Sequence, residues 1–394
     1  MFLFSTIAAS IGAVLALRML LWARYRPTAV HSEDAKPLLT VVIPAFNEGP
    51  MVRRAIDSVL ASDYPQDRLH LIVVDDGSTD DTAHHIRCAA VGERVTVLTL
   101  PQNRGKRHAL YAGFTAAHAR GAEVVATVDS DSIVPPDSLA ALVAPLANRP
   151  GVAAVAGKVT AHNRGQNLLT RMLGVRYILG FDFIRAYQSV LKTVWCCPGA
   201  LQAYRVSVIA PHLEAWRDQR FLGAHCTNGD DHAMTNLVLS LGHDAVYQST
   251  ALVETIVPST YAGLCKMYIR WGRSATREGL RALHYAPARA MRLGPLVGTL
   301  VLLDALLQPL TVLARVVTLA IVVTVGTLHP WGLMQALVVT TGIALLYGVI
   351  FLRSERSWDA GFALLYAWFA LLALPWVQPF ATLTVRRNGW MTRA

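Results

Sequence analysis

Residues 69–80 read LHLIVVDDGSTD, an apolar run of strand length that ends in two adjacent aspartates and a run of turn-forming residues. Such a run favours a buried strand, and the acidic and small residues after it favour a loop and a helix start, with Ser78 or Thr79 as N-cap. Similar runs lie at 39–44, 95–100 and 124–128, and stretches of helical spacing lie at 49–62 and 79–90. This alternation predicts an α/β domain with a mostly parallel sheet and flanking helices.

The composition indicates that this domain is attached to membrane-spanning segments. Of the 394 residues, 53% are hydrophobic and only 16% are charged, and the mean hydropathy is +0.38. This is too apolar for an ordinary soluble enzyme. The apolar residues concentrate at 2–22 and from 296 to the C-terminus. We therefore expect the α/β domain to be inserted between transmembrane helices.

Net charge and cysteine usage exclude other classes. The formal charge is +10, but the chain has no clustered basic stripe and no nucleic-acid-binding module, so a nucleic-acid partner is not expected. The five cysteines show no CxxC spacing and no paired framework. This usage fits a reduced compartment and argues against a structural zinc site.

Four regions follow from these patterns. Residues 1–25 form an N-terminal transmembrane anchor, 38–280 the α/β domain, 281–308 interfacial amphipathic helices, and 309–394 a C-terminal membrane region. The expected spans in that last region are 310–328, 331–352 and 360–385. Arginines follow the anchor rather than precede it, which places the α/β domain in the cytoplasm. The protein is thus expected to be a multi-pass protein of the cell (inner or plasma) membrane.

Two features of the membrane region stay open. Asp304, Gln308 and Arg315 lie in or beside apolar sequence, where they either form a stabilising intramembrane pair or line an aqueous path. Three C-terminal spans would also leave the basic tail outside. Either the last segment, which contains Pro375 and Pro379, does not span simply, or the charge rule fails there.

Polar residues follow each predicted strand, at the edge where open α/β sheets bind ligands. Glu48 ends the stretch PAFNE, the pair Asp75 and Asp76 follows the second strand, and Lys106 lies in NRGKR after the third. Each motif taken alone can be an ordinary loop, a helix cap or a solvated basic turn. Taken together, a carboxylate suits the imide N–H of a uracil ring, and clustered cations around a glycine suit a diphosphate.

Asp129 and Asp131 follow the fourth strand with one residue between them. Two carboxylates so close at a buried strand end repel each other unless a cation lies between them. A divalent ion with oxygen ligands resolves this, and Mg²⁺ or Mn²⁺ bridging a diphosphate is the expected cofactor.

In this order, the motifs PAFNE, DDGSTD, NRGKR, DSD, CPGAL to Tyr204-Arg205, GDD at 229–231 and RWGRS at 270–274 resemble the processive family 2 glycosyltransferases. Within them the chain is most similar to hyaluronan synthases and rhizobial chitooligosaccharide synthases. The resemblance covers residues 38 to 285, and residues 383–390 also resemble the tail of those synthases. It implies a GT-A type fold that binds nucleotide sugars.

The resemblance also implies roles for single residues. Asp231, supported by Asp230, would be the general base that deprotonates the acceptor hydroxyl, and Arg270 would neutralise the departing diphosphate. The implied substrate-binding residues are Asp75, Asp76, Glu48, Lys106, Asp129, Cys197, Gly199, Arg270 and Trp271, and the implied metal ligands are Asp131 and Asp129. Taken alone, an Arg-Trp pair would be packing at a membrane-proximal helix.

The chain departs from the family at two positions. Met267 stands where the family has a glutamine three residues before the arginine, and a thioether cannot replace an amide that both donates and accepts hydrogen bonds. His232 stands where an arginine often follows the acidic triplet. The first departure bears on acceptor binding and processivity.

The leading hypothesis is a membrane-embedded inverting glycosyltransferase that uses a UDP-sugar, UDP-N-acetylglucosamine alone or with UDP-glucuronic acid, to extend and export a β-linked polysaccharide. One alternative is a single transfer to a lipid-linked or other membrane acceptor. The other is a sugar-binding or export subunit without catalysis. The expected partners are the UDP-sugar donor, the growing glycan or membrane acceptor, and the lipid bilayer.

Overall fold

The computed structural model describes residues 2–30, 36–328 and 330–387. Its main sheet has eight strands in the order β3-β2-β1-β4-β7-β6-β10-β5. The first four strands are parallel, as predicted, and are β1 (Leu39–Ala45), β2 (Leu69–Asp75), β3 (Val95–Thr99) and β4 (Val124–Val128). β1 is buried along its whole length, because helices cover both faces of this sheet.

Two hydrophobic cores sandwich the sheet. α2 (Met51–Leu60), α3 (Thr82–Ala89) and α5 (Ser138–Asn148) cover one face, and α4 (Lys106–Ala119) and α10 (Asp230–Ser240) cover the other. Alternate residues of β1 divide between the two cores, Val41 and Ile43 on one side and Val42 on the other. The helices therefore leave the carboxyl ends of the parallel strands as the place for ligands.

The predicted N-cap of α3 is wrong. The helix begins at Thr82, after Asp81, whose side chain does not cap it, and the Thr82 N–H donates to Asp80 Oδ1 at 3.0 Å. Ser78 and Thr79 instead tie two loops together: the Asn47 N–H donates to Ser78 Oγ at 3.1 Å, and the Thr79 N–H donates to Asn47 Oδ1 at 2.9 Å. The loops after β1 and β2 therefore form one joined unit.

The second half of the sheet was not predicted and is mixed. β7 (Leu201–Arg205) runs antiparallel between β4 and β6 (Val152–Ala161), and β10 (Asp244–Thr255) and the short β5 (Ser132–Ile133) complete the edge. The smaller elements are α6 (Leu168–Ile178), the π-helix η1 (Leu179–Phe183), α7 (Ile184–Val190), α8 (Val206–Ile209), the 3₁₀-helix η2 (Ala210–His212), α9 (Leu213–Arg217), β8 (Arg220–Phe221) and β9 (Ala224–His225).

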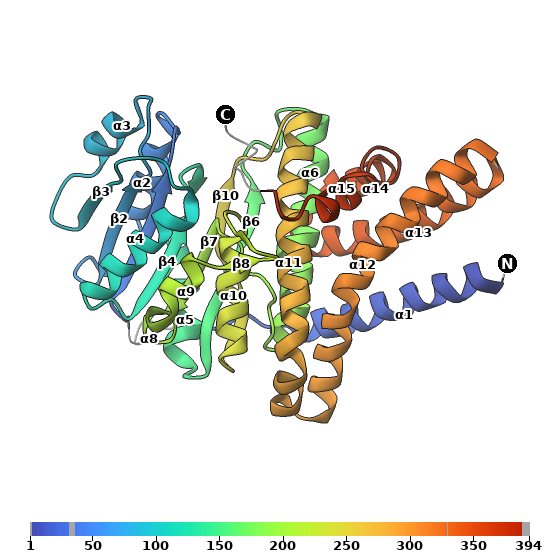
Figure 1. The fold of residues 1–394 in the computed structure, drawn as a ribbon, viewed down its shortest axis with the longest axis horizontal. Helices are drawn as coiled ribbons and strands as arrows, with labels where there is room; N and C mark the ends of the chain where they lie inside the picture. The colour runs from blue at the N-terminus through green and yellow to red at the C-terminus, as the bar shows by residue number, and fades with distance from the viewer. Residues whose placement is uncertain (1, 31–35, 329, 388–394) are drawn as a thin grey trace.

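Long helices make up the rest of the molecule. They are α1 (Phe2–Arg24), α11 (Tyr261–Leu293), α12 (Pro295–Leu328), α13 (Pro330–Glu355), the 3₁₀-helix η3 (Trp358–Gly361), α14 (Phe362–Ala373) and α15 (Val377–Leu383). α1 and α13 project away from the sheet domain, and α11 runs across them beside the sheet (Figure 1). The expected region boundaries at 280 and 308 fall inside α11 and α12, which each run on as one helix.

Within the described residues, one helix, Met334–Glu355, is long and apolar enough to cross a membrane. A second would be the pair Trp358–Ala373 and Val377–Leu383, which is bent by 52°. Pro375 lies at that bend, so the segment expected to span at 360–385 is not one straight helix. The expected spans at 2–22 and 310–328 contain side chains that the structure does not describe. Residues 388–390, the end of the segment that resembles the tail of the synthases, lie outside the described residues.

Candidate active site

A pocket of about 1500 Å³ opens at the carboxyl ends of the parallel strands and reaches α11 and α14. Most of the residues expected at the site line it, namely Asp76, Lys106, Asp129, Asp131, Gly199, Asp230, Asp231, Arg270 and Trp271. Asp75, Glu48 and Cys197 do not. The motifs, although spread over nearly 200 residues of sequence, therefore converge on one cavity.

Asp75 and Asp76 shape the loops at the end of β2. Asp75 is buried, and its carboxylate accepts the N–H of Ser78 at 3.0 Å. Asp76 accepts the N–H groups of Arg104 and Gly105, at 3.0 and 2.8 Å, and burial raises its pKa. Asp76 thus holds the start of α4 against the pocket, while Asp75 braces its own turn from behind.

The DSD turn carries a concentrated negative charge. Lys106 Nζ donates to Asp129 Oδ1, and Thr255 Oγ1 donates to Asp131 Oδ1 at 3.3 Å. Burial and the neighbouring Asp129 raise the pKa of Asp131 to about 6. Glu48 does not line the pocket; it lies behind the DSD turn, where its carboxylate accepts the hydroxyl of Ser130 at 2.6 Å.

Asp129 and Asp131 are the carboxylates that could hold a divalent ion. Their mutual repulsion, with Lys106 as counter-charge, is the electrostatic situation that a bound cation relieves. Among the described residues, no cluster of three or more His, Cys, Asp or Glu side chains has metal-binding geometry. A site with two protein carboxylates suits a hard cation that takes its other oxygen ligands from substrate phosphates and water.

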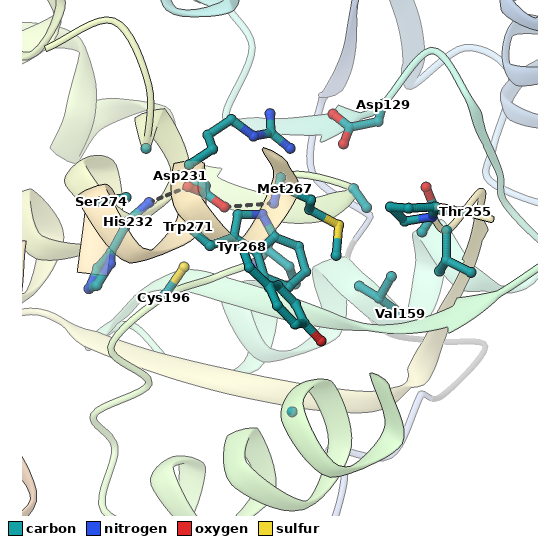
Figure 2. Close-up of a pocket in the computed structure, with 18 of the residues that line it drawn as sticks. Asp129, Val159, Cys196, Asp231, His232, Thr255, Met267, Tyr268, Trp271 and Ser274 are labelled. Carbon is teal, nitrogen blue, oxygen red and sulfur yellow. Dashed lines mark hydrogen bonds between the residues drawn. The ribbon is translucent and has the colours of Figure 1, made fainter. Parts of the chain in front are cut away.

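Two backbone N–H groups orient the Asp231 carboxylate at the start of α10. Its Oδ1 accepts the N–H of His232 at 2.8 Å, and its Oδ2 accepts the N–H of Gly199 at 3.3 Å, as the dashed lines in Figure 2 show. Burial and the neighbouring Asp230 raise its pKa. A partly buried carboxylate with a raised pKa is a stronger proton acceptor than an ordinary aspartate.

The turn before α10 requires glycine. Gly229 has a φ of +72°, and a Cβ there would overlap the Ser274 hydroxyl and lie 3.0 Å from the Arg277 guanidinium. Arg277 in turn donates to the backbone carbonyl of Asn228 at 2.5 Å. The acidic triplet is therefore clamped directly against α11.

Cys196 lines the pocket, whereas the expected Cys197 is buried. The Cys197 N–H donates to Thr235 Oγ1 at 3.0 Å, and burial raises the pKa of its thiol to about 12. The pKa of the Cys196 thiol is raised as well. Both thiols are protonated at neutral pH, which argues against a nucleophilic role for either.

Helical spacing on α11 presents Met267, Arg270, Trp271 and Ser274 to the pocket. Aromatic rings surround Trp271, with centroid distances of 5.8 Å to Phe181 and 6.1 Å to Tyr177. The Tyr177 hydroxyl donates to Met267 Sδ at 3.7 Å, a weak bond because sulfur is a poor acceptor. Figure 2 shows Met267 between Asp231 and Thr255. The departure from the family pattern thus leaves a thioether inside the pocket.

His232 and several residues of α6 and α7 add to the wall. Burial lowers the pKa of His232 to about 4, so its ring is neutral at pH 7. Sequence reasoning missed the wall formed by Arg176, Tyr177, Phe181, Arg185, Gln188 and Trp195. No motif marks these residues; the i, i+4 aromatic pair Tyr177 and Phe181 is the one local signal.

Comparison with known proteins identifies the family of this chain. Residues 40–212 match the model of Glycosyl transferase family 2. The chain is 31% identical over 376 residues to an N-acetylglucosaminyltransferase of Sinorhizobium fredii, covering 93% of this chain and 86% of that protein. It is 36% identical over 292 residues to hyaluronan synthase of Streptococcus pyogenes, covering 71% and 68%.

A solved structure shares the fold. The mannosyltransferase PcManGT from Pyrobaculum calidifontis, in complex with GDP-Man and Mn²⁺, superposes with a TM-score of 0.56 at 22% identity, covering 94% of this chain and 97% of that one. The fold is therefore GT-A-like, and the family match and the relatives together define a glycosyltransferase. The chain belongs to glycosyltransferase family 2.

Proposed function

We propose that this protein is a membrane-embedded inverting synthase that extends a β-linked, hyaluronan- or chitin-like polysaccharide from a UDP-sugar at the cytoplasmic face and exports it. The observation that carries the proposal is Asp231, a partly buried carboxylate with a raised pKa in the same pocket as the DSD turn and Trp271. The relatives named N-acetylglucosaminyltransferase and hyaluronan synthase support N-acetylglucosamine as a transferred sugar, alone or alternating with glucuronic acid.

The donor would occupy the part of the pocket near Asp76, Lys106 and Asp129. Asp131 with Asp129 would hold Mg²⁺ or Mn²⁺, and the ion, when bound, would neutralise diphosphate charge. Lys106, which now pairs with Asp129, is then free to interact with the nucleotide. Arg270, on the same wall, adds a cation for the departing UDP.

The chemical step is a single displacement. As the acceptor hydroxyl oxygen bonds to the anomeric carbon, the bond from that carbon to the β-phosphate oxygen breaks, and UDP leaves with the electron pair. The hydroxyl proton passes to Asp231, which the N–H groups of Gly199 and His232 orient. Attack opposite the leaving group inverts the centre, so an α-linked donor gives a β-linkage. Trp271 offers a flat face for the acceptor sugar.

A second candidate is a single transfer to a lipid-linked or other membrane acceptor. Met267 favours it, because the pocket lacks an amide at the place where the processive relatives by resemblance carry one. The non-catalytic alternative is disfavoured by the complete set of Asp129, Asp131 and Asp231 in one cavity.

The test is UDP release by the detergent-solubilised protein with Mn²⁺ or Mg²⁺, given UDP-N-acetylglucosamine, UDP-glucuronic acid, or both. Turnover that needs both donors supports a hyaluronan-type product, and turnover on the first alone supports a chitin-type product. Asp231→Asn should lower turnover by about 10²–10⁴-fold, the usual contribution of a general base, and leave UDP affinity unchanged. Full activity of Asp231→Asn would refute the assigned base. Products one sugar longer than the acceptor would favour single transfer.

A further inference from the structure

Asp304 on α12 is a buried carboxylate outside the DSD and GDD sites that accepts hydrogen bonds from four different side chains. It is 7% exposed and receives four donors. Its Oδ1 accepts Arg18 Nη2 of α1 at 2.9 Å and the Tyr187 hydroxyl of α7 at 3.0 Å. Its Oδ2 accepts Gln188 Nε2 at 3.3 Å and Trp195 Nε1 at 2.9 Å. Oδ1 therefore takes part in the ion pair with α1, whereas Oδ2 accepts hydrogen bonds from two uncharged side chains, Gln188 and Trp195.

Those two residues belong to the pocket wall. Gln188 and Trp195 both line the cavity that contains Asp231. The amide of Gln188 is engaged at both ends, because its Oε1 accepts Arg185 Nη1 at 3.1 Å. An amide bound at both ends has one orientation, and an indole whose N–H is bound has its ring plane fixed. Arg18 supplies the counter-charge, and the two bonds on Oδ2 couple the carboxylate to Gln188 and Trp195.

The wall is continuous in sequence with a residue that bonds Asp231, the proposed base. Trp195 begins the segment that runs through Cys196 to Gly199, and the Gly199 N–H donates to Asp231 Oδ2 at 3.3 Å. Figure 2 shows Cys196 on the side of Asp231 away from Asp129. Asp129 marks the donor side under the proposed function, so this wall faces the acceptor.

We propose that Gln188 and Trp195 form part of the acceptor-binding wall, and that Asp304 is the positioning residue that holds both. This inference rests on the proposed function and adds to it an element of acceptor recognition. Asp304 touches no reacting atom. It fixes the wall against which the terminal sugar lies, so its loss should affect transfer to a sugar more than transfer to water.

The experiment compares two rates in one preparation. Donor hydrolysis, with water as acceptor, is measured as UDP release without glycan, and transfer is measured with a tetrasaccharide of β-linked N-acetylglucosamine. Asp304→Asn keeps the shape of the side chain but replaces one acceptor oxygen by a donor. It should lower transfer by about tenfold or more, the effect of losing a hydrogen bond to a charged group, and leave hydrolysis within about twofold of wild type. The Kd of the tetrasaccharide, measured by calorimetry, should rise in parallel.

Trp195→Phe is the second variant, because it removes the N–H donor and leaves an aromatic ring and the Arg18 pair in place. It should shift the ratio of transfer to hydrolysis in the same direction, and it decides the question if Asp304→Asn fails to fold. Thr299→Ala is the matched control on α12; among the described residues the Thr299 hydroxyl bonds only the Pro295 carbonyl, and the substitution should leave both rates unchanged. An unchanged ratio and Kd in Trp195→Phe, or an equal loss of both rates, would overturn the inference. A wild type that binds the tetrasaccharide but releases no UDP would contradict the proposed function instead.

Discussion

At the scale of single residues, three carboxylates of the site are each stabilised by a different kind of neighbour. Asp129 has a lysine counter-charge, Asp131 accepts a hydrogen bond from the Thr255 hydroxyl, and Asp231 accepts two backbone N–H groups. Asp230 adds negative charge beside Asp231 and, within the described residues, its Oδ2 has no hydrogen-bond partner. The proton affinity of the base is therefore set largely by burial and by one neighbouring carboxylate.

This arrangement predicts the pH dependence of turnover. Asp231 must be ionised to accept a proton, and its pKa is raised, so kcat should fall on the acid side at a higher pH than an ordinary aspartate would give. Asp230→Asn removes the repulsion that favours the protonated form, so the acid limb should move to lower pH. The measurement is kcat against pH for both proteins.

His232→Gln provides the control for that profile. The imidazole is neutral at pH 7 because its pKa is lowered to about 4, and glutamine keeps a neutral polar side chain there. The acid limb should stay in place in this variant. A limb that moves with His232 and not with Asp230 would assign it to the imidazole.

Residue types were predictable here, but the direction of some side chains was not. The resemblance implied Cys197 as a substrate-binding residue, yet Cys196 lines the pocket and Cys197 is buried. It implied both Asp75 and Asp76 as well, but only Asp76 lines the pocket, and Asp75 lies behind it. Adjacent residues point in opposite directions in extended chain, and no sequence pattern states which of two equal neighbours faces the cavity.

At the scale of elements, the turn at Gly229 joins the acidic triplet to α11. Gly229→Ala should lower activity strongly and destabilise the protein by about 2 kcal/mol, because the positive φ costs 1–2 kcal/mol for a residue with a Cβ and that Cβ would overlap Ser274. Thermal unfolding and UDP release are the measurements.

A matched glycine separates the two contributions. Gly121 has a φ of +78°, and a Cβ there would meet nothing within 4 Å. Gly121→Ala should therefore show the backbone cost alone and keep turnover at the wild-type level. Equal effects of the two substitutions on turnover would show that the contact with Ser274 does not matter for Asp231.

The four parallel strands were predictable because each is a buried apolar run followed by a turn. The other half of the sheet was not. β6 contains several small residues, and β7 is a five-residue strand whose direction depends on its two neighbours. Antiparallel insertion into a parallel sheet is a tertiary choice, set by the loop path between β6 and β7 rather than by local pattern.

At the scale of the whole molecule, the long helices are tied to the sheet by partly buried ion pairs. Lys158 of β6 contacts Glu355 at the end of α13 at 2.6 Å and Asp182 of η1 at 3.6 Å. Tyr247 of β10 donates to the same Asp182 at 3.1 Å. One cation therefore holds two carboxylates from different parts of the fold.

Removing that cation should be costly. Lys158→Met leaves Glu355 and Asp182 close together without compensation, and the expected loss is about 2–4 kcal/mol, seen as a lower Tm in detergent. Arg53→Ala, which breaks the exposed pair with Asp57 at 3.6 Å, is the control and should cost less than about 1 kcal/mol. A Tm for Lys158→Met equal to that of the control would show that the helices do not depend on this pair.

The 33 residues of α11 make a rod of about 50 Å that carries Arg270 and Trp271 near one end and turns into α12 at the other. In mechanical terms it is a beam with one weak point, Pro287, between the Arg270–Trp271 surface and the neighbouring helix hairpin. Motion of its far end reaches the Arg270–Trp271 face through that point. Under the proposed function, the acceptor-facing surface would therefore respond to whatever surrounds α12, and the stiffness of those surroundings would become a parameter of turnover.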